Sequence, residues 1–410
     1  MQHSSGEPLR LLIIVNRLFE WSQNFITREL TELDKQGVQM YVSARRIVSR
    51  DDLSPREKKL LDKYIPIPEN PFTPSNLVKH FKIALQKPRA YGRAWKALFM
   101  MRHNRVSKFF RGLTCLFRAA AIAGVVVSKR INLIHAHFLT APAETALYLS
   151  ELTGIPYGGT AYAMDIYVDN SGLNRKIDKA AYINANTGAN EHFLKNLDIS
   201  DPAKIFKIHS GIEVLPALDV FAPPHPFRFI AVGRLVPKKG FRYLVEACKL
   251  LKQQGLQFHC DMIGIGPLAG ELKAQIEELE LSSFISLIGY VAPNGMASYY
   301  KRSNLLVAPC IIDATGDRDG LPNVFLEAMN FGLPVIAGNV SGIAEGVIAG
   351  ENGWLVPPSD VEKLAAAMHE AIAHQDFQKL REGARRMMLE KFDLRKNMRD
   401  LRRVFEKHSA

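Results

Sequence analysis

The sequence predicts an α/β protein made of two doubly wound halves, because one pattern of elements runs along the chain twice. Short apolar runs of strand type alternate with longer amphipathic runs of helix type, which is typical of parallel sheets with helices on both faces. A length of 410 residues also exceeds what one ordinary hydrophobic core takes in. The proline-rich residues 216–227 separate the two halves and are predicted to be a linker.

The halves define an N-terminal domain at 1–215, a second domain at 228–385 and a helical tail at 386–410, which we expect to pack back on the first domain. The first half has predicted strands at 9–15, 38–43, 133–137 and 157–161, and helices at 24–36, 90–111 and 142–152. The second has strands at 229–232, 258–263, 285–288, 304–308 and 334–337, and helices at 240–254, 268–279 and 323–330. Ligands of such sheets bind at the carboxyl ends of the strands, and here we also expect them in the cleft between the domains.

The composition is that of a soluble globular protein, with 47% hydrophobic and 23% charged residues. The four cysteines form no C-x-x-C pair, which argues against a disulfide framework or a zinc ribbon and suits a reducing compartment. The first apolar run is too short for a signal peptide. The longest, at 113–128, is interrupted by Arg118 and falls short of the ~20 residues that a spanning helix needs. We therefore expect a cytoplasmic protein.

The net charge of +12 is concentrated in one segment. Residues 70–143 contain 13 Lys or Arg and no Asp or Glu, and the predicted helix at 90–111 interleaves aromatic residues with these cations. This helix is either a solvated face or a face that lies on an anionic membrane, and we favour peripheral contact with the inner face of the plasma membrane. Nucleic acid ranks last, because no recognition motif accompanies the charge.

The turn GRLVPKKG follows the first strand of the second half and carries Arg234 and Lys239. Its glycines permit close approach of a ligand to the backbone. Two fixed cations at the edge of a sheet can neutralise the charge that develops on a departing diphosphate. The alternative interpretation is a basic turn that is merely solvated.

The segment DGLPNVFLEAM supplies a second candidate site. Asp319 precedes a predicted helix start, where free backbone N–H groups bind anions, and Glu327 lies about one turn into the helix as an acceptor for sugar hydroxyls. The residues at this start are Gly320, Leu321, Pro322, Asn323 and Val324. An ordinary capped helix is the alternative. Gly264 and Gly266 of a G-x-G turn are weak indicators alone, since a tight strand-to-helix turn has the same pattern.

Taken together, these segments resemble the bacterial retaining glycosyltransferases of family 4, which have the GT-B fold and include exopolysaccharide enzymes of the colanic acid type. "GRLVPKKGFRYLVEA", "MIGIGPL", "ISLIGYV", "DGLPNVFLEAMNFGLPVIAGNVSGIAEGV" and "NGWLVPPSD" carry the resemblance. It implies that Arg234 and Lys239 bind the donor diphosphate. It also implies that Asp319 and Glu327, at the ends of the family's E-x7-E motif, contact the sugar and the ribose, and that backbone around Tyr290 reads the nucleobase.

The first half resembles the family more loosely, through "HAHF", "LTGIPY", "TAYAMDIY" and "HSGIEV". These motifs place His137, Tyr162 and Asp165 on the acceptor side of the cleft. Two positions depart from the family pattern. Asp319 replaces a Glu, and Tyr162 stands where a His is common. With an ordinary pKa of ~10, the Tyr162 hydroxyl does not replace a histidine near neutral pH in the same way.

The expected activity is retaining transfer of a sugar from a UDP or GDP type donor to a lipid-linked or saccharide acceptor, after domain closure and with no cofactor. The D-x-D sequence of Asp317 and Asp319 is discounted as a metal site, because Arg234 and Lys239 already supply positive charge. His135 and His137 are interpreted as core or cleft residues, since no third ligand lies near them in sequence. A nucleotide-sugar epimerase and a non-catalytic binding homologue remain as alternatives.

Overall fold

The computed structural model describes residues 8–20, 23–48, 53–101, 105–216, 225–374 and 376–410. The chain divides into two compact units, one of Met1–Ser210 with Leu394–Ala410 and the other of Gly211–Asp393. Each unit contains one six-stranded sheet whose paired strands are all parallel, which confirms the predicted fold class. The divisions lie at 210/211 and 393/394, whereas the sequence analysis placed them at 215 and 386. The predicted linker lies mostly outside the described residues.

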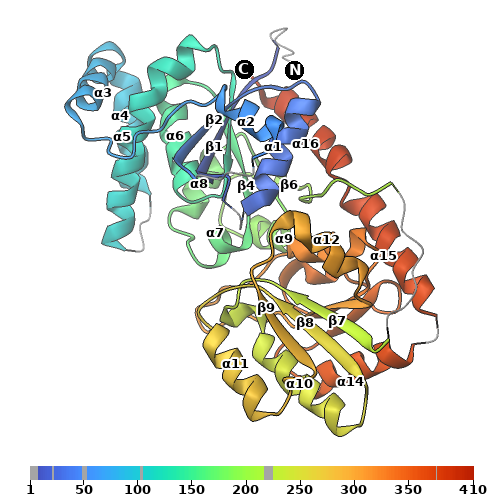
Figure 1. Cartoon of the computed structure of the whole chain (residues 1–410). Helices are drawn as coiled ribbons and strands as arrows, with labels where there is room; N and C mark the ends of the chain where they lie inside the picture. Colours follow the sequence, from blue (N-terminus) through green and yellow to red (C-terminus); the bar gives the residue numbers. More distant parts are fainter. Residues whose placement is uncertain (1–7, 21–22, 49–52, 102–104, 217–224, 375) are drawn as a thin grey trace. The chain divides into compact units, whose positions relative to one another are not determined.

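The sheet of the first unit has the strand order β2-β1-β3-β4-β5-β6 (Figure 1). Successive residues of the central β1 enter different cores, because side chains alternate between the faces of a strand. Leu12 and Ile14 join the core under α5 and α6, while Leu11 and Ile13 join the core under α1 and α16. The strands are β1 (Arg10–Leu18), β2 (Gln39–Ile47), β3 (Leu133–His137), β4 (Tyr157–Ala161), β5 (Tyr182–Ala185) and β6 (Ile205–Lys207).

Six helices of this unit lie directly on its sheet or follow its strands: α1 (Asn24–Lys35), α6 (Ala141–Thr153), α7 (Ala163–Tyr167), α8 (Leu173–Lys179), α9 (Gly188–Lys195) and α16 (Leu394–His408). A short 3-10 turn, η2 (Pro202–Lys204), precedes β6. The last helix, α16, packs against α1, and the Arg402 guanidinium donates to the Gln36 carbonyl at 2.6 Å. The C-terminal helix therefore belongs to the unit that begins the chain.

The segment between β2 and β3 is helical: α2 (Pro55–Leu61), α3 (Pro74–Gln86), α4 (Pro88–Met100) and α5 (Val106–Ser128). The prediction of one helix at 90–111 is wrong, because α4 ends at Met100 and α5 begins at Val106. The bend brings aromatic rings of the two helices together, with the Phe99 and Phe109 centroids 6.0 Å apart. The residue periodicity is helical both before and after this break, so the break itself was the only feature of residues 90–111 that the sequence did not predict.

Helix α5 is also longer than its apolar stretch suggested. Its 23 residues make it, within the described residues, the one helix whose length and composition would let it cross a membrane. Half of its apolar window is buried inside the unit. Cys115, Leu116 and Ala119 are completely buried in the core that α5 shares with α6.

The second unit has the strand order β12-β11-β10-β7-β8-β9. The chain runs from β7 outward to β9 and then returns to β10 on the other side of β7, so the topological switch point lies between β7 and β10. Ligands of doubly wound sheets bind at this point, beyond the carboxyl ends of the strands. The strands are β7 (Phe227–Val232), β8 (Phe258–Ile263), β9 (Ile285–Gly289), β10 (Leu305–Ala308), β11 (Val335–Gly338) and β12 (Gly353–Val356).

Its helices pack on the two faces of this sheet, and alternate residues of β7 again enter separate cores. They are α10 (Phe241–Gln253), α11 (Ala269–Glu278), α12 (Pro293–Lys301), α13 (Asn323–Asn330), α14 (Val361–Ala373) and α15 (Phe377–Lys391), with 3-10 turns η3 (Pro237–Lys239) and η4 (Ser341–Glu345).

Candidate functional site

Two loops meet where β7 and β10 end. The loop after β7 contains η3 and ends at Gly240, and the loop after β10 begins at Pro309. The Ile311 N–H donates to the Lys238 carbonyl at 2.9 Å, and a Cβ at position 240 would lie 2.0 Å from the Pro309 carbonyl oxygen. Gly240 also has a φ of 69°, so only glycine suits this contact. The fold thus brings the two predicted motifs together, although ~80 residues separate them in sequence.

A lysine–aspartate cluster lies at this junction. The Lys239 ammonium is 2.7 Å from one oxygen of Asp319, and the Lys238 ammonium is 3.4 Å from the other. Lys238 also lies 3.0 Å from Asp317. The side chains of Lys239 and Asp319 are only 13% and 16% exposed. From the sequence, Lys239 was assigned to the donor diphosphate and Asp319 to the donor sugar. In the structure the two side chains form an ion pair with each other.

Lys238 was missed by the sequence analysis. In a basic turn every cation has the same pattern, and nothing in the sequence distinguishes a buried lysine from a solvated one. The structure buries Lys238 within η3 and surrounds its ammonium with the two carboxylates of the D-x-D sequence.

Charge pairing keeps Lys239 and Asp319 ionised. Burial alone would raise the pKa of Asp319, but Lys239 and Lys238 outweigh burial and hold that pKa below its ordinary value. Burial alone would lower the pKa of Lys239, but Asp319 outweighs it and raises that pKa. Burial, followed by the nearby Asp319 charge, raises the pKa of the Cys310 thiol to about 12. The thiol is therefore protonated near neutral pH and is not a nucleophile there.

Arg234 lies at the exposed tip of the same turn. Its charge is close enough to oppose that of Lys239, since it acts to lower the Lys239 pKa. The N–H groups on either side of it fix the turn, because Gly233 donates to Ile263 at 3.0 Å and Leu235 donates to Ile265 at 2.9 Å. The turn is thus held rigidly while the guanidinium extends into solvent.

Gly264 and Gly266 have a structural role that accounts for their presence. A Cβ at 264 would lie 1.8 Å from the Gly233 carbonyl oxygen, and one at 266 would lie 2.4 Å from that of Leu235. Gly264 also has a φ of 151°, a conformation that other residues rarely adopt. These glycines let the loops after β7 and β8 touch, and their contact with a nucleotide stays a prediction.

Helix α13 begins at Asn323, four residues after Asp319 of the lysine–aspartate cluster. Pro322 precedes it, and no side chain caps this end. The first N–H groups of a helix have no partner within the helix, which is the arrangement that binds anions. Gly320, Leu321 and Val324 complete the segment that was predicted to contact phosphate, and this contact also stays a prediction.

Glu327 is half-buried on α13 and accepts a hydrogen bond from the Tyr300 hydroxyl at 3.1 Å. Tyr300 is 2% exposed and lies on α12. The sequence analysis did not identify this tyrosine, because the contact joins separate helices. Tyr290, predicted to lie near the nucleobase, is 54% exposed just after β9.

The three residues predicted for the acceptor side lie in the first unit and are buried. The His137 Nδ1 is 3.0 Å from the Tyr162 hydroxyl. Burial lowers the pKa of His137 to about 3 and raises that of Tyr162 well above its ordinary value, so both are neutral near pH 7. Asp165 accepts hydrogen bonds from the backbone N–H groups of Leu139 and Tyr162. It therefore fixes the chain between β4 and α7, and its contact with an acceptor stays a prediction.

Glu29 joins this buried group from α1, and the sequence analysis missed it. Its carboxylate lies 4.0 Å from the His137 Nδ1. Burial raises the pKa of Glu29 to about 7, partly offset by a hydrogen bond with Ser210. His135 is fully buried, with its ring nitrogens 3.0 Å from the Tyr182 hydroxyl and 3.1 Å from that of Thr160. His137 is buried as well, at 2% exposure, and the interpretation of both histidines as core or cleft residues stays a prediction.

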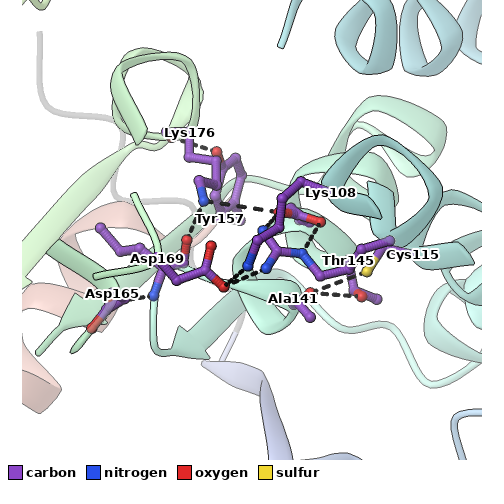
Figure 2. A network of polar contacts seen from close by, with 11 residues as sticks. Lys108, Cys115, Ala141, Thr145, Tyr157, Asp165, Asp169 and Lys176 are labelled. Atoms are coloured by element: carbon purple, nitrogen blue, oxygen red, sulfur yellow. Dashed lines mark hydrogen bonds and ion pairs between the residues drawn. The ribbon is translucent and has the colours of Figure 1, made fainter. Parts of the chain in front are cut away.

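A buried ionic network, which the sequence analysis also missed, joins α5 to the body of the first unit. The Arg111 guanidinium bonds to Glu144 through two nitrogens and to Asp169 through the third, and the Lys108 ammonium is 2.7 Å from Asp169. Glu144 and Lys176 are completely buried. Figure 2 shows Lys108, Asp169 and Lys176 within one network of dashed contacts, in which Lys108 reaches Asp169. The network anchors α5 to α6 and to the α7–α8 segment.

Comparison with known proteins matches residues 220–387 to the family described as Glycosyl transferases group 1. A Salmonella typhimurium protein that bears the name colanic acid biosynthesis glycosyltransferase WcaL is 34% identical over 196 residues, which are 47% of this chain and 48% of that protein. This chain therefore spans about half the length of the curated relative that it matches.

Solved structures match the fold over nearly the whole chain. A glycosyltransferase from Rickettsia africae superposes with a TM-score of 0.71 at 17% identity and covers 98% of this chain and 99% of its own. Anabaena HepE, solved in complex with UDP-glucose, gives a TM-score of 0.67 at 16% identity over 96% of this chain and 98% of its own. Residues 220–387 thus match the family Glycosyl transferases group 1, in a chain that has the GT-B fold.

Proposed function

We propose that this chain is a retaining, metal-independent glycosyltransferase that moves a sugar from a UDP or GDP type nucleotide-sugar to an acceptor in cell-surface polysaccharide biosynthesis. The observation that carries the proposal is the meeting of the basic turn after β7 with the loop that leads into α13, at the switch point of the sheet. The name of the Salmonella relative and the UDP-glucose in the HepE structure support it.

The charges at this edge suit a diphosphate. Lys238 and Lys239 pair with Asp317 and Asp319, and Arg234 adds a third cation to the same turn, which leaves one positive charge in excess among these five residues. The start of α13 adds the partial positive charge of a helix N-terminus. Negative charge grows on the diphosphate as its bond to the sugar breaks, and preorganised cations stabilise that charge more strongly than the ground state.

Asp319 would have two tasks in this reaction. It fixes the Lys239 ammonium at 2.7 Å, and a carboxylate has about four acceptor positions, so it retains capacity for hydroxyls of the transferred sugar. Glu327, oriented by the Tyr300 hydroxyl, would hold the ribose.

The environment of the D-x-D carboxylates supports a reaction without a divalent metal. The Lys238 ammonium lies 3.0 Å from Asp317 and 3.4 Å from Asp319, where a cation bridging the two carboxylates would otherwise lie. Activity is therefore expected to survive treatment with EDTA. Complete loss of activity in EDTA that is restored by added Mg²⁺ or Mn²⁺ would contradict this part of the proposal.

Retention follows from attack on the same face of the sugar that the diphosphate leaves. The acceptor oxygen forms a bond to the anomeric carbon while the bond from that carbon to the phosphate oxygen breaks, and the departing phosphate takes the acceptor proton. The acceptor is a lipid-linked or free saccharide. The residues proposed for the acceptor side are His137, Tyr162 and Asp165. Because they are buried, they shape the acceptor-binding surface from beneath more than they contact the acceptor directly.

A thermal-shift screen with UDP, GDP and ADP sugars tests donor binding. A ligand that binds only the folded chain stabilises it by about 2.7 kcal/mol at a hundred times its Kd, so the matching nucleotide raises the melting temperature. Arg234→Ala should reduce this shift, and Lys252→Ala, which removes a cation that pairs with Glu280, should leave it unchanged. The donor assignment fails if no nucleotide sugar shifts the wild type or if the Arg234→Ala shift is normal.

Incubation with a nucleotide sugar and no acceptor separates transfer from the two alternatives. A transferase gives slow hydrolysis or no reaction. Rapid accumulation of an epimerised nucleotide sugar would show an epimerase instead. Tight donor binding with no turnover on any acceptor would show a binding homologue.

A further inference from the structure

Helix α3 exposes an apolar stripe that no described part of the chain covers. Val78, Phe81 and Leu85 are spaced by three and four residues, so they lie on one side of the helix. They are 66%, 69% and 83% exposed. Of the 13 residues of α3, only His80 is buried. Such exposure of large apolar side chains on one side of a helix marks an interaction surface.

The opposite side of α3 is fixed to the fold. The His80 ring lies 3.8 Å from the ring of Phe117 on α5 and 5.2 Å from that of Tyr91 on α4, measured between centroids. Helix α5 is itself anchored by the ionic network of Lys108 and Arg111 (Figure 2). The outward direction of the stripe is thus set by rigid contacts.

The structure separates the cations of this basic segment into two groups. Several are engaged within the fold, since Arg93 pairs with Glu151, Lys108 and Arg111 belong to the network, and Arg118 donates to the carbonyls of Pro68 and Glu69. A second group is exposed and pairs with no carboxylate among the described residues: Lys79 and Lys82 lie on α3 beside the stripe, Lys87 follows α3, and Arg89 lies at the start of α4.

We propose that α3 docks on an anionic lipid surface, with Val78, Phe81 and Leu85 inserted at the acyl boundary and these four cations at the headgroup phosphates. An apolar stripe flanked by Lys and Arg is the pattern of a helix that lies in a membrane interface. The proposal is independent of the donor site, because α3 belongs to the first unit and the lysine–aspartate cluster to the second.

Other occupants fit this surface less well. A second copy of the chain would bring Lys79 and Lys82 of one α3 against the same residues of another, and like charges repel across an interface. A saccharide needs hydrogen-bonding groups beside its stacking surface, whereas Val78, Phe81 and Leu85 have none. Nucleic acid gains nothing from the aliphatic Val78 and Leu85, since bases stack on aromatic or guanidinium planes.

Co-sedimentation of the full chain with vesicles tests the proposal. The wild type should bind vesicles of phosphatidylcholine mixed with phosphatidylglycerol at physiological salt, and should bind phosphatidylcholine alone much more weakly. Each cation near an anionic surface contributes about fivefold to binding, so Lys79→Glu with Lys82→Glu should reduce binding by roughly 30-fold or more. Phe81→Ser with Leu85→Ser should reduce it by about tenfold or more, because the inserted area is lost.

Two matched variants control for general effects. Lys249→Glu with Lys273→Glu makes the same change of charge on exposed positions of the second unit, and Val125→Ser with Val127→Ser removes exposed apolar side chains from the far end of α5. Both should bind vesicles as the wild type does, and all variants should keep the wild-type melting temperature.

Three results would overturn the proposal. The first is a wild type that does not bind the anionic vesicles. The second is Phe81→Ser with Leu85→Ser binding them normally, which would show charge attraction without insertion. The third is a wild type that is dimeric without vesicles and becomes monomeric in this variant, which would assign the stripe to a second copy.

Discussion

Replacing Lys239 by alanine probes the donor site directly, because its ammonium group is held by a carboxylate that is itself a predicted site residue. In Lys239→Ala the Asp319 carboxylate keeps Lys238 as its ionic partner, at 3.4 Å instead of the 2.7 Å of the lost contact, and the Cys310 thiol as a weak donor at 3.8 Å. Breaking a fully buried pair costs about 3–5 kcal/mol. Since these side chains are 13% and 16% exposed and a second lysine remains, we expect a loss of about 1–2 kcal/mol in unfolding free energy.

The effect on turnover should be larger than the effect on stability. Removing one group that stabilises transition-state charge costs about 10²–10³ in rate. The assay is the initial rate of nucleoside diphosphate release in the presence of acceptor, with urea unfolding measured on the same protein. Lys249→Ala, which removes an exposed lysine from α10, is the control and should change neither quantity.

A double-mutant cycle with Asp319→Asn separates two roles of Lys239. If Lys239 acts on the diphosphate, its removal lowers the rate again in the Asp319→Asn background. If Lys239 only neutralises Asp319, the double variant has the rate of Asp319→Asn alone. A Lys239→Ala rate within about threefold of the wild type, in a protein of unchanged stability, would refute the assignment of this residue to the donor site.

Three further predictions concern stability and are each read from urea unfolding. Burial raises the pKa of Glu29 from 4.5 to about 7, so its favourable contribution to the free energy of unfolding is present below pH 4.5 and is lost as the pH rises through 7. At roughly 1.4 kcal/mol per pH unit, Glu29→Gln should therefore gain about 3 kcal/mol of stability relative to the wild type between pH 4.5 and 8. Parallel pH profiles of the two proteins would contradict this. Gly264→Ala should lose about 2 kcal/mol or more of stability, because the new Cβ would collide with backbone at a φ that alanine rarely adopts. Gly270→Ala, with open space around it, is the control and should be neutral or stabilising. Equal effects of the two substitutions would contradict the close backbone contact at Gly264. Arg111→Ala should lose about 3 kcal/mol, because the buried Glu144 carboxylate then keeps only Lys176, at 4.0 Å, as an ionic partner. Arg93→Ala, from an exposed pair, should lose less than about 1 kcal/mol, and similar losses in the two variants would show that the network is not a structural anchor.

The sequence predicted the site better than it predicted the contacts within it. Arg234, Lys239 and Asp319 were all selected from motifs, and the structure brings Lys239 and Asp319 together at the edge of one sheet. The ion pair between Lys239 and Asp319 was not predicted, and Lys238 was not selected at all. Motifs record which residues occur and how far apart they are along the chain, whereas an ion pair depends on which side chains the loops turn inward.

The helical segment between β2 and β3 shows the same division. Its charge and its aromatic residues are plain in the sequence, but the thirteen cations of residues 70–143 share one pattern. Only the packing of α3, α4 and α5 shows that Lys108 and Arg111 hold the fold together while Lys79 and Lys82 stay exposed beside an apolar stripe. The membrane surface that we propose is therefore the outward side of α3, whereas the sequence placed it on the predicted helix at 90–111.

By itself the sequence determined the two parallel-sheet units and the motifs at the strand ends, because apolar periodicity and turn residues act over a few neighbouring positions. The tertiary structure alone decided the partners of Lys238, Glu29 and Glu327, since these contacts join elements far apart along the chain. Burial also decided the protonation of Glu29 and His137, because removing a charge from water changes its energy only once the surrounding elements have packed.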